Sequence, residues 1–336
     1  MNKSKLIILS DSFFAEAFLK ESIIPSNIKK LDLVTNKKNT KLNRLIKNSK
    51  IDCNVHVVKR LSPEFFKKKF NIKKTLLISA GSTWIIKKEI INLFKKNILN
   101  IHQSALPSLR GAVASYVKLY EIRALQTCLH VVKEKIDEGE IVYSKNIFIS
   151  KEHDTPYKIN NLLQKKNREM LKEFLISYFI KKNKISYNKQ NEFFSSYMPR
   201  LKTTINGWID WSLNVYELER FIGAFGDPYP GAKTMIHGKE VSLMDVQLSC
   251  MEPSRHSFEN GMVIRKFLDM VVVSVNGGSL YIKKIVSKNK NIIDKIIPGD
   301  IFYTKKEKID FIKRKNIFIR SNKKIYNRVD HYIKKF

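Results

Sequence analysis

The sequence predicts an α/β fold: a Rossmann-like, doubly wound and mostly parallel sheet, followed by a smaller, mainly β C-terminal domain. Two observations lead to this prediction. Apolar runs alternate with helix-like segments through the first half of the 336 residues, and parallel strands need such helical crossover connections. Beyond residue 206 the pattern is mainly β, since the valine-rich run 271–275 precedes a Gly277-Gly278 hairpin turn and a second apolar run, 280–285.

Each expected element of the first half rests on a local pattern. Short apolar runs predict buried strands, and Ser62 followed by Pro63 is typical of a helix N-cap and first helical position. The spacing of apolar residues in 155–179 predicts a long amphipathic helix. The expected order is strand 5–9, helix 11–21, strand 30–35, a basic helical segment 37–50, strand 55–58, helix 62–70, strand 76–79, helix 87–94, strand 98–101, helix 112–123, strands 126–132 and 139–149, and helix 155–179.

The length and the changes in composition predict two domains. The first, residues 1–183, carries the alternating pattern and is expected to hold the catalytic site. A polar, lysine-rich linker follows at 184–205, and the mainly β domain covers 206–304. Residues 305–336 form a basic tail.

The net charge of +32 would attract nucleic acid or an anionic membrane. Lysines greatly outnumber arginines, however, and lysine pairs along helices usually form a solvated face. No apolar run approaches the roughly 18 to 20 residues of a membrane span, and the N-terminus lacks a signal-peptide pattern. We therefore expect a cytoplasmic protein without a membrane partner.

Cysteine and histidine usage predicts neither disulfides nor a metal site. Cys53, Cys128 and Cys250 are scattered along the chain and read as reduced thiols. The histidines lack partners at the spacing of metal ligands.

One motif contains residue types that are typical of a catalytic site. Asn100 and His102 stand two residues apart in an apolar run, and Asp137 follows further along the chain. In a strand, residues i and i+2 point to one face, about 6 to 7 Å apart. An amide can donate to a developing oxyanion, a histidine can move a proton near neutral pH, and a carboxylate can orient the histidine or take a proton. These three groups suit acyl transfer, although an isolated Asn-x-His is more often a plain strand end.

The amino-acid sequence around this motif resembles that of a known protein family. The stretch 100–111 looks like the signature N-x-H-x-S-L-L-P-x-x-R-G, and 127–141 looks like its partner, in which T-x-H precedes D-x-G-x-I. A third stretch, 207–234, contains Trp208, Asp210, Trp211 and an Asp227-Pro-Tyr-Pro turn. In this order the three are similar to folate-dependent formyltransferases, which include methionyl-tRNA formyltransferase and the sugar N-formyltransferases.

The resemblance implies transfer of a formyl group from N10-formyltetrahydrofolate to a primary amine, without a metal. Asn100 would donate to the oxyanion, His102 would stabilise that charge or relay a proton, and Asp137 would hold His102 or a water. Which of His102 and Asp137 is the formal base stays open. The pterin would be held largely by backbone groups, and the expected cofactor-binding residues are Ala80, Gly81, Ser82, Trp84, Ile85, Asp137 and Gly139.

Three further residues of these motifs have less specific expectations. Ser104 and Arg110 are expected at the acceptor-binding side. Ser104 more often shapes such a loop, and Arg110 is expected either on an acidic loop or near an acceptor phosphate. His130, two residues after Cys128 in a strand pattern, is expected to be structural.

The expected acceptor is a nucleotide-linked amino sugar used for surface polysaccharide. The alternative is charged initiator tRNA, which the basic segment 37–50, the net charge and the β domain would suit. A non-catalytic RNA-binding protein and a formyltetrahydrofolate hydrolase are further alternatives, and the three intact polar residues argue against the first of these. The sequence leaves a homodimer open.

Overall fold

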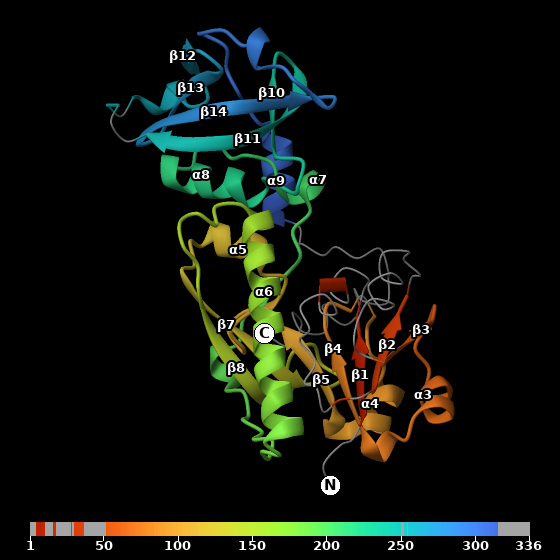
Figure 1. The fold of residues 1–336 in the computed structure, drawn as a ribbon. Helices are drawn as coiled ribbons and strands as arrows, with labels where there is room; N and C mark the ends of the chain where they lie inside the picture. Colours follow the sequence, from red (N-terminus) through yellow and green to blue (C-terminus); the bar gives the residue numbers. More distant parts are fainter. Residues whose placement is uncertain are drawn as a thin grey trace. The chain divides into compact units, whose positions relative to one another are not determined.

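The computed structural model describes residues 5–10, 16–17, 28, 30–36, 52–82, 84–249, 252–253 and 255–314. The chain divides into two compact units, each with its own sheet (Figure 1). Unit 1 comprises Met1–Gly111, Ala124–Phe148 and Asn161–Tyr197, and unit 2 comprises Ala112–Arg123, Ile149–Asn160 and Met198–Phe336. Most of the expected helix 11–21, the basic segment 37–50 and the end of the tail, 315–336, lie outside the described residues.

Unit 1 is built on a seven-stranded sheet in the order β3-β2-β1-β4-β5-β7-β8. The first five strands in this order run parallel, β7 runs antiparallel to β5, and β8 runs antiparallel to β7. The strands are β1 (Lys5–Leu9), β2 (Lys30–Thr35), β3 (Asp52–Val57), β4 (Thr75–Ser79), β5 (Ile98–His102), β7 (Ala124–Val131) and β8 (Ile141–Phe148). The mostly parallel sheet confirms the predicted fold class. In such sheets, ligands bind beyond the carboxyl ends of the strands.

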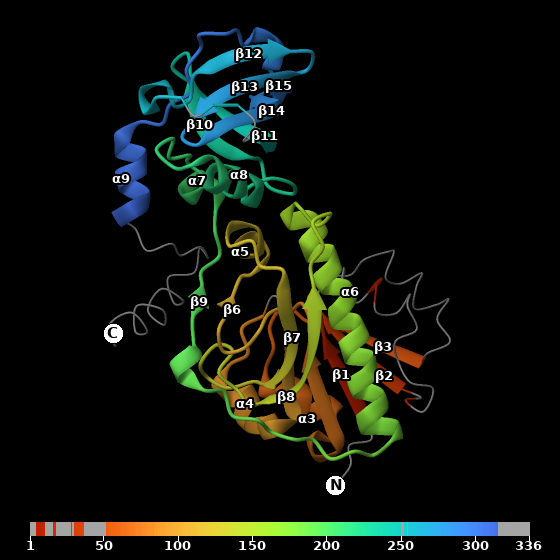
Figure 2. The same ribbon diagram turned by 90° about the vertical axis from the view of Figure 1, so that its left-hand side faces the viewer.

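Alternate residues of the strands face opposite sides of this sheet, because the side-chain period of a strand is two. Leu6 and Ile8 belong to one hydrophobic cluster, together with Met170 and Phe174 of α6 (Pro156–Leu175). The neighbouring β1 residues belong to a second cluster with α3 (Pro63–Lys69) and α4 (Lys88–Phe94). Both faces are therefore covered by helices, as Figure 2 shows for α6 on the near side.

One expected helix begins as predicted, and two others differ in detail from their predictions. The Ser62 hydroxyl caps α3 as predicted, by accepting from the Phe65 N–H at 3.2 Å. The long helix α6 ends at Leu175 and continues as a π turn, Ile176–Ile180. The helix expected at 112–123 is shorter, α5 (Ala114–Leu119), and belongs to unit 2.

The segment expected as a linker, 184–205, packs on unit 1 as far as Tyr197. It contains the 3₁₀ turn η4 (Glu192–Phe194) and the short strand β9 (Tyr197–Met198). β9 pairs with β6 (Arg110–Gly111), and the Arg110 N–H donates to the Ser196 carbonyl at 3.0 Å. This part of the chain is thus fixed beside the signature stretch.

Unit 2 contains an antiparallel sheet in the order β10-β11-β14-β13-β12, with β15 paired to β14. Val275 of β13 pairs with Gly278 of β14, so the predicted hairpin is confirmed. The strands are β10 (Ala232–Ile236), β11 (Lys239–Ser249), β12 (Val263–Phe267), β13 (Met270–Val275), β14 (Gly278–Ser287) and β15 (Lys290–Asn291). The remaining helices are α7 (Thr203–Asn206), α8 (Val215–Ala224) and α9 (Lys306–Arg314), with 3₁₀ turns at Ile72–Lys74, Lys95–Asn97, Ser257–Glu259 and Ile293–Lys295.

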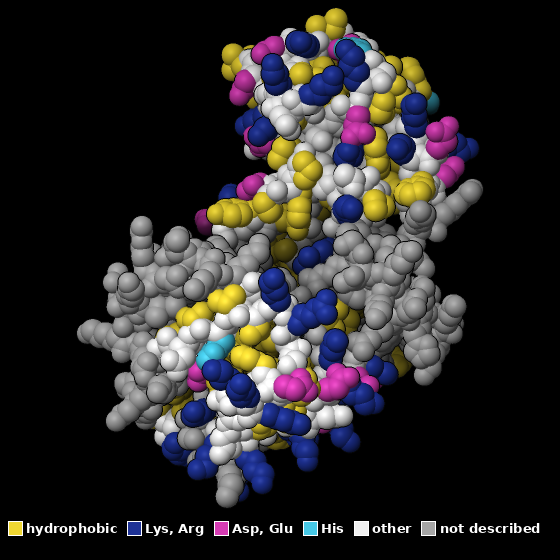
Figure 3. All heavy atoms as spheres, turned by 90° about the vertical axis from the view of Figure 1, so that its right-hand side faces the viewer, with side chains coloured by type: hydrophobic (Ala, Val, Ile, Leu, Met, Phe, Trp, Pro, Cys, Tyr) yellow, Lys and Arg dark blue, Asp and Glu magenta, His cyan; other side chains and the backbone are white. Residues whose placement is uncertain are grey.

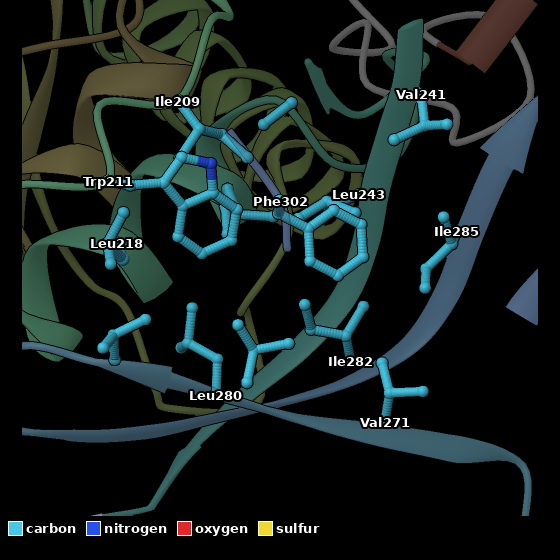
Figure 4. Close-up of a cluster of buried hydrophobic side chains, with 14 of the residues drawn as sticks. Ile209, Trp211, Leu218, Val241, Leu243, Val271, Leu280, Ile282, Ile285 and Phe302 are labelled. Carbon is cyan, nitrogen blue, oxygen red and sulfur yellow. The ribbon is translucent and has the colours of Figure 1, made fainter. Parts of the chain in front are cut away.

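The core of unit 2 lies between its sheet and α8 (Figure 4). Trp211 stacks on Phe302, with ring centroids 5.8 Å apart, and its indole N–H donates to the Thr234 hydroxyl at 2.9 Å. A buried tryptophan N–H usually finds such an acceptor. None of the described helices is long and apolar enough to cross a membrane.

Candidate active site

The carboxyl ends of β4 and β5 place the first site residues. In the parallel register of these strands, Ser79 lies beside Asn100. Asn100 and His102 share a face of β5, because they are two residues apart. His102 is 7% exposed, and its Nε2–H donates to the Leu109 carbonyl at 2.9 Å.

The antiparallel pairing of β5 with β7 adds a second histidine. The register sets Asn100 opposite His130. The Asn100 Nδ2 group donates to His130 Nε2 at 3.2 Å, and His130 Nδ1 donates to the Val131 carbonyl at 2.9 Å. An amide nitrogen carries two hydrogens, so this contact uses one of them.

The loop between β7 and β8 brings Asp137 to these groups. One carboxylate oxygen, Oδ2, lies 3.4 Å from His102 Nδ1, and the other, Oδ1, lies 3.4 Å from His130 Nε2. The Gly111 N–H also points to Oδ2, at 3.4 Å. The three residues singled out in the sequence therefore lie in one largely buried cluster, with His130 as a fourth member.

Burial and charge set the protonation of this cluster. Burial lowers the pKa of His102, and the nearby Asp137 only partly offsets that effect, so His102 is neutral at pH 7. Burial alone would raise the pKa of Asp137, but His102, His130 and the Gly111 N–H outweigh it and lower this pKa to about 2. The cluster combines an ionised carboxylate with a neutral imidazole.

Backbone carbonyls fix which ring nitrogens face the carboxylate. A carbonyl oxygen only accepts, so His102 carries its proton on Nε2 and His130 on Nδ1. Since His102 is neutral, its Nδ1 faces Asp137 Oδ2 with a lone pair. Such an arrangement can accept a proton and hold it beside a carboxylate.

The expected pterin-binding segment begins directly after β4, next to Asn100. Ala80 is fully buried, and its N–H donates to the Leu9 carbonyl at 2.8 Å. Gly81 has a φ of 65°, where glycine is unstrained. The remaining expected residues of this segment are Ser82, Trp84 and Ile85. The Trp84 N–H donates to the Ser82 hydroxyl, and the Ile85 side chain is 41% exposed.

Gly139, also expected at the cofactor site, is required for close packing. A Cβ at this position would lie 1.6 Å from the Val131 carbonyl oxygen. The backbone after Asp137 therefore presses directly on the end of β7. Its contribution to cofactor binding stays a prediction.

Ser104 and Arg110 have partners within the protein. Ser104 is fully buried, and its hydroxyl donates to the Leu109 carbonyl, the same oxygen that His102 binds. Arg110 is 4% exposed and donates two hydrogen bonds to Glu192, at 2.7 and 2.9 Å. Of the two positions expected for Arg110, the structure gives the acidic loop. Acceptor binding by either residue stays a prediction.

His130 is the residue whose position sequence reasoning missed. It was expected to be structural, yet it contacts both Asn100 and Asp137. Its place in the T-x-H part of the second signature was the available signal. Among the described residues, no group of three or more His, Cys, Asp or Glu side chains is placed to hold a metal ion.

Comparisons with known proteins agree with these features. A family model described as "Formyl transferase" matches residues 12–175, and one described as "Formyl transferase, C-terminal domain" matches residues 202–296. Methionyl-tRNA formyltransferase of Buchnera aphidicola subsp. Acyrthosiphon pisum is 28% identical over 228 residues, which are 67% of this chain and 69% of that protein.

Two solved structures share the fold. WlaRD, a sugar 3N-formyl transferase solved with dTDP and 5-N-formyl-THF, has a TM-score of 0.60 and 20% identity, and the match covers 83% of this chain and 96% of WlaRD. The N-formyltransferase of Helicobacter canadensis, solved with folinic acid and dTDP-3-aminofucose, also has a TM-score of 0.60, with 19% identity over 84% of this chain and 99% of that one.

Proposed function

Because this chain belongs to the formyl transferase family, and is therefore an enzyme that transfers the formyl group of formyltetrahydrofolate, we propose that its acceptor is the primary amine of a nucleotide-linked amino sugar. We place the reaction in unit 1. The observation that carries this placement is the convergence of Asn100, His102 and Asp137, from two segments of the chain, in one largely buried cluster that also contains His130.

The segment after β4 fits the pterin of the folate. Ala80 and Gly81 carry little or no side chain, and the partly exposed Ile85 offers an apolar surface. Flat heterocycles bind where backbone groups and apolar side chains line a site together. When bound there, the folate supplies the formyl group as an acyl donor.

Asn100 and its neighbours would stabilise the charge that develops in the reaction. The Asn100 N–H that His130 does not use would donate to the formyl oxygen as the amine attacks. His130 holds the amide in place, since its Nε2 accepts the other N–H at 3.2 Å. A donor held in position before the reaction costs no reorganisation during it.

His102 and Asp137 would handle the protons. The attacking amine must lose a proton, and the departing folate nitrogen must gain one. His102 is neutral and Asp137 is ionised at pH 7, and their Nδ1 and Oδ2 atoms are 3.4 Å apart. A proton taken up here is shared by the pair, so the negative carboxylate stabilises the imidazolium.

The charges beside the site support a small acceptor. The loop that carries Asp137 also carries Glu134, Glu138 and Glu140, and the lysines near it pair with these acids. On the face drawn in Figure 3, Asp and Glu lie among Lys and Arg side chains that are more widespread. Carboxylates repel an RNA backbone, which binds by contacts of many phosphates with unpaired cations. A nucleotide-linked amino sugar, like the one in the Helicobacter canadensis complex, carries far fewer phosphate charges than an RNA, so its binding requires fewer cations.

Charged initiator tRNA is the second candidate acceptor. Its support is the 28% identity to methionyl-tRNA formyltransferase over 228 residues. The basic segment 37–50, which would bind the tRNA under this alternative, lies outside the described residues.

A single screen separates the two acceptors. The full chain, with formyltetrahydrofolate, is incubated with nucleotide-linked amino sugars or with charged initiator tRNA, and His102→Ala serves as the inactive control. We expect formyl transfer to an amino sugar. Formylation of the tRNA would overturn the proposal, most clearly if it falls with salt and is lost when Lys37, Lys38, Lys41 and Arg44 are neutralised. Formate released without any added amine would indicate a hydrolase instead.

A further inference from the structure

We propose that Gln190 is a positioning residue of the active site, which, together with Arg110 and Glu192, clamps the Asp137 loop against the sheet. The clamp lies in the segment that the sequence predicts to be a linker. The inference rests on the proposed roles of Asp137 and His102, but it concerns how the protein holds them and is independent of the acceptor.

The Gln190 amide spans both sides of the loop. Its Nε2 group donates to the Asp137 carbonyl at 2.7 Å and to the Gly139 carbonyl at 2.6 Å. Its Oε1 atom accepts from Arg110 Nη2 at 2.8 Å. One side chain therefore uses both amide hydrogens on the loop backbone and its oxygen on a buried cation, so its orientation is fully determined.

Arg110 fixes the other end of the clamp. The guanidinium is buried and makes two parallel hydrogen bonds to the Glu192 carboxylate, at 2.7 and 2.9 Å, and a third carboxylate contact to Glu138 at 3.6 Å. The hydrogen bond from Arg110 is the largest cause of the lowered pKa of Glu192. Bidentate pairs of this kind fix geometry as well as charge. The residue after Arg110, Gly111, gives its N–H to the Asp137 carboxylate.

The loop needs such support because its backbone is constrained on both sides. Asp137 has a φ of 57°, in the left-handed region that residues with a Cβ seldom adopt. Two residues later, Gly139 lies so close to Val131 that no side chain fits. Strained backbone persists only where the surrounding contacts hold it. The two Gln190 bonds flank this strained stretch, and they are accepted by the carbonyls of Asp137 itself and of Gly139.

The position of the Asp137 loop affects the pKa of His102. The Asp137 carboxylate raises the pKa of His102, against burial and against the charges of His130 and Arg110, which lower it. If the loop relaxes, the carboxylate moves from its place 3.4 Å from His102 Nδ1, and the pKa of the imidazole falls further. Proton transfer then loses its partner, while the pterin-binding segment after β4 is untouched.

The test compares Gln190→Met, which keeps the side-chain volume without its hydrogen bonds, with Gln190→Ala and with Lys189→Ala, an exposed neighbour outside the site. The NMR titration of the His102 imidazole is recorded in the full chain without substrate. kcat and the KM for formyltetrahydrofolate are then measured with the acceptor found in the screen. We expect a lower His102 pKa and a kcat reduced at least about tenfold in both Gln190 variants, with the donor KM and the Lys189→Ala values near those of the wild type.

Two outcomes would overturn the clamp. One is a His102 titration and a kcat in Gln190→Met that match Lys189→Ala. The other is a loss in Gln190→Ala that Gln190→Met restores, because that result would assign the effect to packing rather than to hydrogen bonding. If no acceptor is formylated, the proposed function fails, whereas the His102 titration still decides the clamp.

Discussion

Asn100 and His130 face each other across two antiparallel strands, with the amide Nδ2 and the imidazole Nε2 3.2 Å apart. The histidine ring is itself fixed by the Val131 carbonyl. This contact orients the amide of Asn100, and in the proposed mechanism its second N–H is the oxyanion donor. The orientation of Asn100 therefore depends on a residue of the neighbouring strand.

Replacing His130 tests this dependence. We expect His130→Ala to lower kcat at least about tenfold, since the oxyanion donor loses its orientation and Asp137 loses one of its two imidazole neighbours. Steady-state kinetics with formyltetrahydrofolate measures the effect. His237→Ala is the matched control, because it also removes a histidine paired with an aspartate, at 2.6 Å, but in unit 2. Equal kcat values for the two variants would contradict the assignment.

Removing the amide itself should have a larger effect. Asn100→Ala should lower kcat by about a hundredfold to a thousandfold, the usual loss when one oxyanion donor is deleted. Asn146→Ala, which removes an exposed amide that accepts from Gln126 at the surface, should leave kcat unchanged. Single-turnover rates are the suitable measurement, and a loss of less than about tenfold for Asn100→Ala would rule out the oxyanion role.

Stability should depend on pH through Asp137. Its pKa is about 2 in the folded protein, against about 3.9 in an unfolded chain. A lowered carboxyl pKa contributes stability above the unfolded value, and this contribution is lost as the pH falls through the folded value. The free energy of unfolding of the wild type, relative to Asp137→Asn, should therefore fall by about 2 kcal/mol between about pH 4 and pH 2. Urea unfolding across this range measures it, and a constant difference would be inconsistent with the lowered pKa.

Gly139→Ala should disturb both stability and rate. The added Cβ would meet the Val131 carbonyl oxygen at 1.6 Å, so the loop has to move. We expect a loss of about 1 to 3 kcal/mol in the free energy of unfolding, together with a lower kcat because Asp137 moves with the loop. In Gly238→Ala, by contrast, the new Cβ meets no heavy atom within 4 Å, and only the φ of 72° opposes it. Thermal unfolding and kcat are measured for both variants. Similar values for the two would refute the proposed role of the close contact between Gly139 and Val131.

Part of the fold and part of the candidate site could be predicted from local sequence patterns. The shared face of Asn100 and His102 follows from the period of two in a strand, and Ser62 is a recognisable helix cap. The position of Asp137 could be predicted only through a family resemblance, because a loop residue reaches a strand residue by tertiary contacts.

The remaining features depend on pairings that local patterns do not specify. His130 meets Asn100 because β7 is antiparallel to β5 in one register, and a change of one residue would turn it to the other face. Gln190 lies in a polar, lysine-rich stretch that is typical of a linker. Its role appears only when Arg110 and the Asp137 loop are seen beside it.

The identity of the acceptor is decided by kcat/KM for a nucleotide-linked amino sugar and for charged initiator tRNA, determined for the same preparation at physiological salt. We predict a higher kcat/KM for the amino sugar, abolished in His102→Ala. A higher value for the tRNA would contradict the proposal and assign the chain to initiator tRNA formylation.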